Sequence, residues 1–301
     1  ILLCVGAVNF LGPVTPSIWK EGPMQPGHQT ILILDFGSQY TQLIARRIRE
    51  QGVYCEIKPC TDSPPVQLPD QLKGVILSGG PSSVYDADAP PFDDRWLDIS
   101  LPILGICYGM QLLARNAGAD VERAAHREYG FASVKTGQHP LFNGVDANTN
   151  VWMSHGDHVS KPPDGWQVIG SSKNCPVAAM SNASSSRVGI QFHPEVTHSA
   201  QGVTMLRNFL FDMCHVSPDW TMGSFIDEQV EVIRARVGPD HVICGMSGGV
   251  DSAVTAQLLH RAIGDQLHCI FVDNGVLRKG ERDSVAAEFQ DLNLTVVDAR
   301  S

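Results

Sequence analysis

The chain has 301 residues, 43% of them hydrophobic, and a formal net charge of −10. That length is enough for two globular domains of ordinary size. The acidic balance argues against general binding to nucleic acid or to an acidic membrane surface, and no apolar run is long enough to cross a membrane. Any anionic ligand would have to be bound by local groups.

The eight cysteines are scattered along the chain, and none forms a C-x-x-C pair. A chain of this size does not need a disulfide framework. The cysteines and histidines also show no spacing typical of metal ligands. We therefore expect reduced thiols and a cytoplasmic protein.

The first residues, ILLCVGAVNFLG, form a short apolar run with no basic segment before it and no clear cleavage site after it. The chain does not begin with Met, and Met24 lies just before the first convincing element. We expect residues 1–28 to lie outside the fold, with residues 1–23 as an extension or upstream translated sequence.

The next part of the chain alternates buried-looking strands with helical stretches. Strands are expected at 30–35, 53–59, 73–77 and 101–106, and residues 39–52 place apolar side chains on one helical stripe. Such alternation predicts an open, mostly parallel sheet flanked by helices on both faces.

The most informative segment is GICYGMQ, Gly105 to Gln111, where the buried run LPILGI meets a helical stretch. A cysteine between two glycines at a strand-to-helix turn resembles a nucleophile elbow, because glycines permit a tight, strained turn. The start of a helix favours a thiolate. Cys107 is therefore the candidate nucleophile, and a buried structural cysteine is the alternative.

From about Tyr129 to Gln191, short strand-like pieces are separated by Gly, Pro, Asn and Ser, as in an antiparallel or mixed extension of the sheet. The strand RVGIQFHPE follows, and a helix over 199–214 closes a first domain, residues 29–214. Residues 215–223 are expected to form a linker.

Residues 224–301 begin a second α/β unit. Ser224 with Asp227 is expected to cap a helix that ends at Gly238-Pro239. A strand, the loop SGGVDS, a helix, the strand LHCIFVDNG, a helix from about Gly280 and the strand LNLTVVDA follow. The unit is expected to be an incomplete α/β domain.

Cys107 needs a base, and the best candidate is His193 in QFHPE. In an extended segment, residues two apart point to the same side, so Glu195 can hold the imidazole in the required tautomer. Acyl transfer also needs an oxyanion hole. The amides of Gly79, after a buried strand, and of Tyr108, next to the nucleophile, are the candidates.

The order SGGP, GICYGMQ and FHPE resembles a class I glutamine amidotransferase domain. The resemblance implies thiolate attack on the side-chain carboxamide of glutamine, release of ammonia and hydrolysis of a γ-glutamyl thioester. It also implies that glutamine is held by the helix after Cys107 and by the segment WMSHGD. The residues in question are Gln111, Ser154, His155 and Gly156.

The loop SGGVDS joins a buried strand to a helix, where successive amides and the helix N-terminus favour a phosphate chain. It lacks the lysine of a Walker A loop. It resembles the pyrophosphate-binding loop of N-type ATP pyrophosphatases, which implies ATP as co-substrate and places Asp251 near Mg²⁺. The ATP-binding residues implied are Ser247, Gly248, Gly249, Val250, Asp251, Ser252, Val272 and Asp273.

A glutaminase followed by an adenylating domain resembles the glutamine-hydrolysing GMP synthetase family. That family aminates xanthosine 5′-monophosphate (XMP) with ATP and ammonia, and continues past the equivalent of Ser301 into a dimerisation domain. The resemblance implies a homodimer for the full-length enzyme. We expect the 301-residue chain to retain glutaminase activity and to make no GMP alone.

Three alternatives stay open. Another class I amidotransferase or a γ-glutamyl hydrolase would share the elbow and HPE, but SGGVDS argues against both. A tRNA-thiolating ATP pyrophosphatase would need a basic RNA-binding surface, and the negative net charge of the chain argues against one. A catalytically silent fragment that only binds a ligand or partner is the third.

Overall fold

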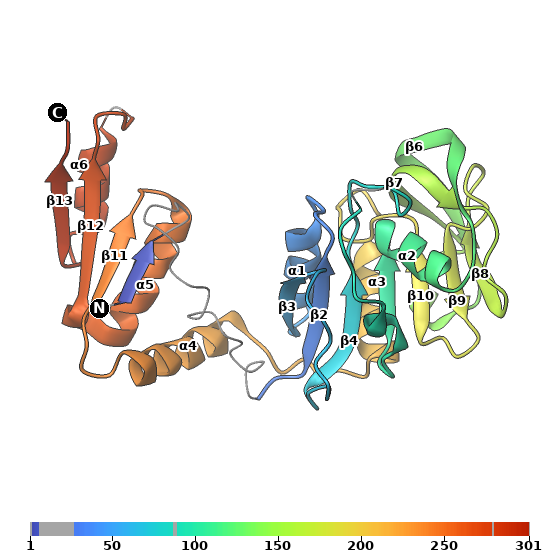
Figure 1. The fold of residues 1–301 in the computed structure, drawn as a ribbon, viewed down its shortest axis with the longest axis horizontal. Coiled ribbons are helices and arrows are strands. Elements are labelled where there is room, and N and C mark those ends of the chain that lie inside the picture. Colours follow the sequence, from blue (N-terminus) through green and yellow to red (C-terminus); the bar gives the residue numbers. More distant parts are fainter. Residues whose placement is uncertain (1, 6–26, 87–88, 279, 301) are drawn as a thin grey trace. The chain divides into compact units, whose positions relative to one another are not determined.

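The computed structural model describes residues 2–5, 27–86, 89–278 and 280–300 (Figure 1). It divides into two compact units, one spanning Gly22–Trp220 and the other formed by Thr221–Ser301 with Ile1–Glu21. Among the described residues, no helix has both the length and the hydrophobicity needed to span a membrane.

The Gly22–Trp220 unit is built on a nine-stranded sheet with the order β3-β2-β4-β5-β10-β9-β8-β6-β7. The first five strands in this order run parallel and the rest pair antiparallel, so the predicted mixed extension is confirmed. The strands are β2 (Thr30–Asp35), β3 (Tyr54–Pro59), β4 (Leu72–Leu77), β5 (Ile103–Ile106), β6 (Val121–Thr136), β7 (Asn148–Val159), β8 (Trp166–Ser171), β9 (Ala179–Asn182) and β10 (Arg187–Ile190).

Helices bury apolar side chains on both faces of this sheet. One core cluster joins the sheet to α1 (Thr41–Arg49) and α3 (Gly202–Asn208), and a second joins it to α2 (Tyr108–Asn116). A parallel strand buried on both faces needs such covering, which explains the continuous apolar runs of β2 and β4. Shorter turns of helix are η2 (Asp94–Asp98), η3 (Pro140–Phe142) and the π-helical η4 (Phe209–Met213).

Two residues of the predicted linker 215–223, Val216 and Trp220, are buried, and the other seven are exposed. The Trp220 side chain is buried, its backbone N–H donates to the Gly52 carbonyl at 2.9 Å, and the Ser217 N–H donates to Gln29 Oε1 at 2.8 Å. Helix α4 (Met222–Val237) then begins. The prediction that Ser224 and Asp227 cap this helix is wrong, because Thr221 is the N-cap and Ser224 returns its hydrogen bond in a capping box.

The Thr221–Ser301 unit contains a parallel sheet in the order β1-β11-β12-β13. Helix α5 (Val250–Ile263) follows β11, the 3₁₀ turn η5 (Gly264–Gln266) follows α5, and α6 (Glu281–Glu288) follows β12, as the alternating pattern predicts. The strands are β1 (Leu2–Val5), β11 (Val242–Met246), β12 (Leu267–Asp273) and β13 (Leu294–Asp298).

Strand β1 differs from the expectation that residues 1–28 lie outside the fold. Leu2–Val5 pairs in parallel with β11, because a short apolar run can complete the open edge of a parallel sheet. Residues 27 and 28 border β2, and His28 lies 3.4 Å from Asp219. The rest of the predicted extension, residues 6–26, lies outside the described residues.

Candidate functional site

The candidate site lies where three neighbouring parallel strands end. Strands β4, β5 and β10 are adjacent in the sheet, and Ile106 and Ile190 are paired in register. The N–H of Cys107 donates to the carbonyl of Ile190 at 2.8 Å, which ties the residue after β5 to the end of β10. The segments after these strands therefore meet at the carboxyl edge of the sheet, where open α/β folds bind ligands.

Cys107 occupies a strained turn between β5 and α2. Its φ of 51° and ψ of −102° lie in a region that a non-glycine residue enters at a cost of about 1–3 kcal/mol. The flanking glycines are required for packing, since a Cβ on Gly105 would lie 2.5 Å from the Gly109 carbonyl oxygen and one on Gly109 would collide with the Leu77 carbonyl oxygen. Helix α2 thus starts pressed against the sheet and holds the thiol at its N-terminus.

His193 and Glu195 form a buried pair beyond the end of β10. His193 Nδ1 donates to Glu195 Oε1 at 2.7 Å, and the Glu195 side chain is fully buried. The N–H of His193 donates to the Trp152 carbonyl at 3.0 Å, and Arg47 Nε donates to the Glu195 carbonyl at 3.0 Å. The carboxylate fixes the proton on Nδ1, so Nε2 is the ring nitrogen left for Cys107.

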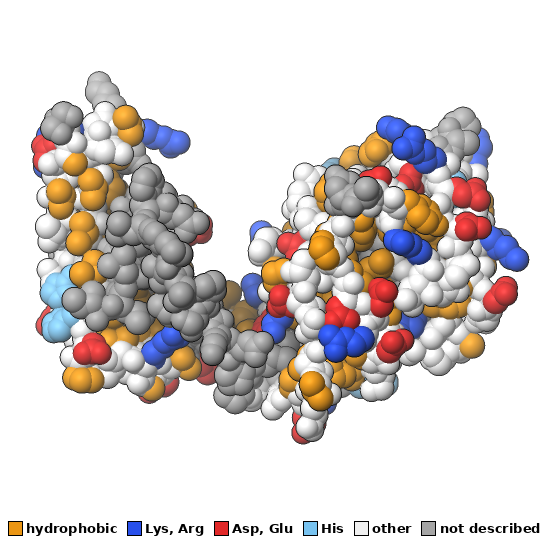
Figure 2. All heavy atoms as spheres, in the orientation of Figure 1, with side chains coloured by type: hydrophobic (Ala, Val, Ile, Leu, Met, Phe, Trp, Pro, Cys, Tyr) orange, Lys and Arg blue, Asp and Glu red, His pale blue; other side chains and the backbone are white. Residues whose placement is uncertain are grey.

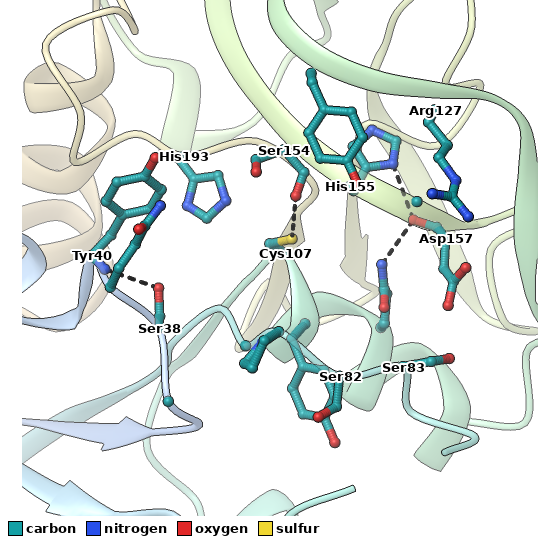
Figure 3. A pocket seen from close by; sticks show the side chains of 18 of the residues that line it. Ser38, Tyr40, Ser82, Ser83, Cys107, Arg127, Ser154, His155, Asp157 and His193 are labelled. Carbon is teal, nitrogen blue, oxygen red and sulfur yellow. Dashed lines mark hydrogen bonds between the residues drawn. The ribbon is translucent and has the colours of Figure 1, made fainter.

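The imidazole is held in its protonated form. Burial alone would lower the pKa of His193, but its hydrogen bonds and charge interactions with Cys107 and Glu195 outweigh burial and raise the pKa to about 10. Figure 3 shows the His193 ring beside Cys107. A protonated imidazole next to a sulfur stabilises the thiolate form.

We expect NMR titration of imidazole-labelled protein to place the His193 midpoint near pH 10, well above the ordinary 6.5. Because the folded-state pKa is raised, the stabilisation from this proton is complete below pH 6.5 and is lost as the pH rises through 10. Glu195→Gln removes the paired charge and should lower the midpoint, and His193→Gln assigns the signal. A midpoint near 6.5 in the unaltered protein would contradict this account.

Both predicted oxyanion donors lie close to Cys107. Tyr108 directly follows Cys107 at the start of α2 and lines the cavity. Gly79 follows β4, and a Cβ built on it would lie 3.2 Å from His193 Cε1 and 3.8 Å from Cys107 Cβ. No larger residue fits there without moving the imidazole.

A cavity of about 580 Å³ opens above the thiol, a volume typical of small-molecule sites. Its lining brings together most of the residues predicted from the sequence (Figure 3). These are Cys107, Tyr108, Gln111, Ser154, His155, Gly156 and His193.

The residues predicted to hold glutamine differ in how many of their side-chain polar atoms already form hydrogen bonds within the protein. Gln111 Nε2 donates to the Asp157 carbonyl at 2.9 Å and to Gln191 Oε1 at 3.3 Å. Both ring nitrogens of His155 are engaged, with the Asp157 carbonyl and with Glu128. Ser154 presents its carbonyl to Cys107 Sγ at 3.7 Å. The geometry therefore favours the backbone of 154–156, and not the imidazole, as the surface that faces a ligand.

The sequence reasoning missed two residues of this site. Gln191 Nε2 donates to Cys107 Sγ at 3.5 Å, and the Tyr40 ring meets the His193 ring edge-on with centroids 5.0 Å apart. Gln191 lies two residues before His193, so the alternation of an extended segment was the available signal. Tyr40, in the loop before α1, gave no such signal.

Replacing Gln191 by leucine is expected to lower kcat for glutamine hydrolysis by about 10- to 100-fold with little change in KM, because a hydrogen-bond donor to the sulfur is lost. The measurement is steady-state glutamate release, with the rate of Cys107 alkylation at fixed pH as a second readout. Gln167→Leu, at an exposed position of β8, is the matched control. Equal rates for both variants would exclude this role for Gln191.

The second candidate site is the loop between β11 and α5. Ser252 Oγ donates to the Gly249 carbonyl at 2.9 Å and accepts from the Ser247 N–H at 3.2 Å, which curls the loop over the helix start. Gly248 has a φ of 76°, a conformation that favours glycine. Val250 and Asp251 are exposed on the first turn of α5.

The other predicted residues of this site lie at the end of β12. Asp273 is buried, accepts from the Gly275 N–H at 3.0 Å and lies 3.5 Å from Arg300 and 3.8 Å from Arg282. Val272 is exposed beside it. Strands β11 and β12 are neighbours, so both loops lie at the same carboxyl edge of this sheet.

Comparison with known proteins finds matches in both units of the chain. A family model described as glutamine amidotransferase class-I matches residues 32–213, and one described as the HUP domain of tRNA methyl transferase matches residues 240–293. A solved structure from Thermoplasma acidophilum, described as a subunit of a putative GMP synthase, superposes with a TM-score of 0.55 at 31% identity, covering 63% of this chain and 95% of that one.

Two curated relatives extend the match along the sequence. The glutamine-hydrolysing GMP synthase of Geobacillus kaustophilus is 52% identical over 90% of this chain, and that of Solidesulfovibrio magneticus is 54% identical over 89%. The chain spans 54% of the length of each of these relatives. With an amidotransferase model over most of the first unit and GMP synthases as its relatives, the chain belongs to the class-I glutamine amidotransferase family.

Proposed function

We propose that the Gly22–Trp220 unit hydrolyses glutamine to glutamate and ammonia, with Cys107 as nucleophile. The observation that carries the proposal is the cysteine in a strained elbow beside a buried histidine that is itself paired with a buried carboxylate. This is the arrangement of nucleophile, base and orienting acid that acyl transfer requires.

In the first half of the reaction, the Cys107 thiolate attacks the side-chain carbonyl carbon of glutamine. The negative charge that develops on the carbonyl oxygen is stabilised by the amides of Gly79 and Tyr108. The His193 imidazolium gives its Nε2 proton to the nitrogen as the C–N bond breaks, and ammonia leaves. A γ-glutamyl thioester on Cys107 and a neutral imidazole remain.

In the second half, the neutral His193 takes a proton from water, and the resulting hydroxide attacks the thioester. The same two amides stabilise the second tetrahedral intermediate. Its collapse breaks the C–S bond, releases glutamate and restores the thiolate beside an imidazolium. Glu195 holds the ring in place throughout, and the raised pKa of His193 supports a protonated imidazole in the resting state.

The test is release of glutamate and ammonia from glutamine by the 301-residue chain, with asparagine as the control substrate. We expect equimolar products from glutamine and none from asparagine, whose carboxamide lies one methylene closer to the α-carbon. Absence of glutamate release at high enzyme concentration would contradict the proposal and favour a chain that only binds a ligand.

We further propose that the whole protein uses this ammonia to convert XMP to GMP with ATP, since its relatives are named glutamine-hydrolysing GMP synthases. The match of residues 240–293 to a HUP domain supports the ATP-binding half. The family resemblance alone supports a homodimer. Formation of GMP from XMP, ATP, Mg²⁺ and glutamine by the full-length protein is the corresponding assay.

The residues of the second unit fit a phosphate chain. Gly248 adopts a left-handed conformation, and the Ser247–Ser252 loop lies at the N-terminus of the 14-residue helix α5, where amides favour anions. Ser247, Gly248 and Gly249 would hold the phosphates, with Val272 and Asp273 at the adjoining strand end and Asp251 as one carboxylate for Mg²⁺. Bound ATP would supply activation of the XMP oxygen by adenylation.

A cytoplasmic setting is part of the proposal. Cys55, Cys60, Cys107, Cys175, Cys214 and Cys269 are thiols outside any disulfide. Unpaired cysteines are typical of reducing compartments. The described surface of the first unit mixes acidic and basic side chains on the face seen in Figure 2.

A further inference from the structure

A second cluster of reactive side chains lies beside the cavity and takes no part in the proposed reaction. Among the described residues, one group of three potential metal ligands is found: Glu128, His155 and Cys175. One ligand atom from each lies within 4.8 Å of the other two. His155 and Cys175 are buried, and the Glu128 side chain is 10% exposed.

The three side chains are held by three separate parts of the antiparallel half of the sheet. Glu128 on β6 and His155 on β7 are direct partners in register, just after an irregularity in the ladder. Cys175 lies in the turn between β8 and β9, where its N–H donates to Ser172 Oγ at 3.0 Å and its carbonyl accepts from the Ser172 N–H at 2.8 Å. Backbone pairing therefore brings the three groups together.

The hydrogen bonds of His155 leave one nitrogen facing the other two ligands. Nδ1 lies 3.0 Å from the Asp157 carbonyl, which can only accept, so Nδ1 carries a proton. In the neutral ring, Nε2 then presents its lone pair to Glu128 Oε2 at 3.2 Å. Two acceptors in contact need a cation or a proton between them. A histidine that donates its other N–H to a backbone carbonyl is also the usual form of a metal ligand.

The donor set and its charge select the cation. A thiolate, an imidazole and a carboxylate are the ligands that Zn²⁺ prefers, with water completing four-coordination. Burial, with the Glu128 charge, raises the pKa of Cys175 to about 12, so binding sends one thiol proton to solvent. The resulting thiolate and the Glu128 carboxylate together neutralise a divalent ion in a site with little access to water.

The three ligand atoms need to approach one another only slightly to bind one metal ion. Bonds of about 2.0–2.3 Å in a tetrahedral site place ligand atoms about 3.4–3.8 Å apart. The ligand atoms all lie within 4.8 Å of one another, so no separation needs to shrink by more than about 1.4 Å. The partly exposed Glu128 side chain is the member most free to move.

We propose that Glu128, His155 and Cys175 form a binding site for one zinc ion, which joins β6, β7 and the β8–β9 turn beside the glutamine cavity. Through His155 and the Asp157 carbonyl, the ion holds the segment 154–157 that lines that cavity. The three ligand positions support the zinc site whether or not the proposed glutaminase reaction occurs.

The experiment is titration of the metal-free 301-residue chain with Co²⁺, a spectroscopic substitute for Zn²⁺. We expect one tetrahedral site with a thiolate-to-cobalt charge-transfer band, which Zn²⁺ bleaches by displacement. Zinc should also raise the temperature of the unfolding transition followed by tryptophan fluorescence. An ion pair with a shared proton in place of a metal would give no band and no shift, which would overturn the proposal.

Variants separate this site from the other thiols and imidazoles. Cys175→Ser should abolish the charge-transfer band and weaken zinc binding by at least about 100-fold, and Glu128→Gln should weaken it strongly. Cys107→Ser and Cys60→Ser should leave the band intact. His268→Asn should also leave it intact, and it removes the exposed His241–His268 pair as a competing site.

The charge-transfer band in two variants decides where the ion binds. If the band persists in Cys175→Ser and disappears in Cys107→Ser, the ion binds at the candidate catalytic pair and the proposal is wrong. A band that survives in both variants excludes the site as well. Circular dichroism of Cys175→Ser checks that the variant is folded, and Cys175→Ala with unchanged unfolding but no band gives the same support.

Discussion

Replacing Cys107 by alanine is expected to abolish glutamate release, lowering kcat by about 10⁴-fold or more. The loss of a nucleophile that acts together with its base removes the covalent route altogether, and only slow background hydrolysis remains. The measurement is steady-state release of glutamate from glutamine. Binding of glutamine should persist, because the cavity walls are unchanged.

The matched control is Cys60→Ala, which removes another buried thiol that does not line the cavity. We expect this variant to keep its kcat and to lose only a little stability, as for a small buried side chain. If Cys107→Ala retained activity, or if both variants lost it equally, the proposed nucleophile would be wrong. Retained folding of Cys107→Ala is checked by circular dichroism.

Gly109→Ala is expected to destabilise the first unit by about 3 kcal/mol or more. A single methyl group there has no room, because its carbon would collide with the Leu77 carbonyl oxygen and lie 2.6 Å from Leu77 Cβ. Helix α2 must then move away from β4, and Cys107 at its N-terminus moves with it. Activity should fall together with stability.

Urea unfolding followed by tryptophan fluorescence measures this effect, since four of the five tryptophans belong to the first unit: Trp96, Trp152, Trp166 and Trp220. Gly156→Ala is the control, because its added carbon has its nearest neighbour at 3.8 Å. The control should change stability by less than about 0.5 kcal/mol. Equal midpoints for the two variants would show that α2 does not pack as tightly as described.

The parts of the site that the sequence predicted are those encoded locally. A buried strand, a glycine, a cysteine, a glycine and a helix occupy adjacent positions, so the elbow at Cys107 could be inferred from that segment alone. The alternation of His193 and Glu195 likewise follows from two residues of one extended segment. Their approach to Cys107 depends on β10 pairing with β5, a contact between distant segments that no local pattern encodes.

The parts that were missed depend on contacts between distant segments. Gln191 was not recognised because a polar residue at the end of a buried strand has many possible partners, and only the fold selects the sulfur. The three proposed zinc ligands come from β6, β7 and a turn before β9, so no short spacing marks them. The register of an irregular ladder brings Glu128 opposite His155.

Two errors concern the ends of elements. Thr221 and Ser224 form the capping box before α4, with a serine in place of the usual Glu or Gln. The usual sequence pattern therefore predicts the N-cap at Ser224, three residues after the observed N-cap. The expectation that Leu2–Val5 lies outside the fold rests on the absence of a starting Met and on Met24 just before the first convincing element. The partner of this segment, β11, begins at Val242.

The central claim is that glutamine becomes covalently attached to the sulfur of Cys107. The most direct measurement is rapid acid quenching of the chain during turnover, followed by mass spectrometry of its peptides. We predict one γ-glutamyl group on the peptide that contains Cys107, and its absence in Cys107→Ala. Glutamate release without any such adduct, or an adduct on another residue, would contradict the claim.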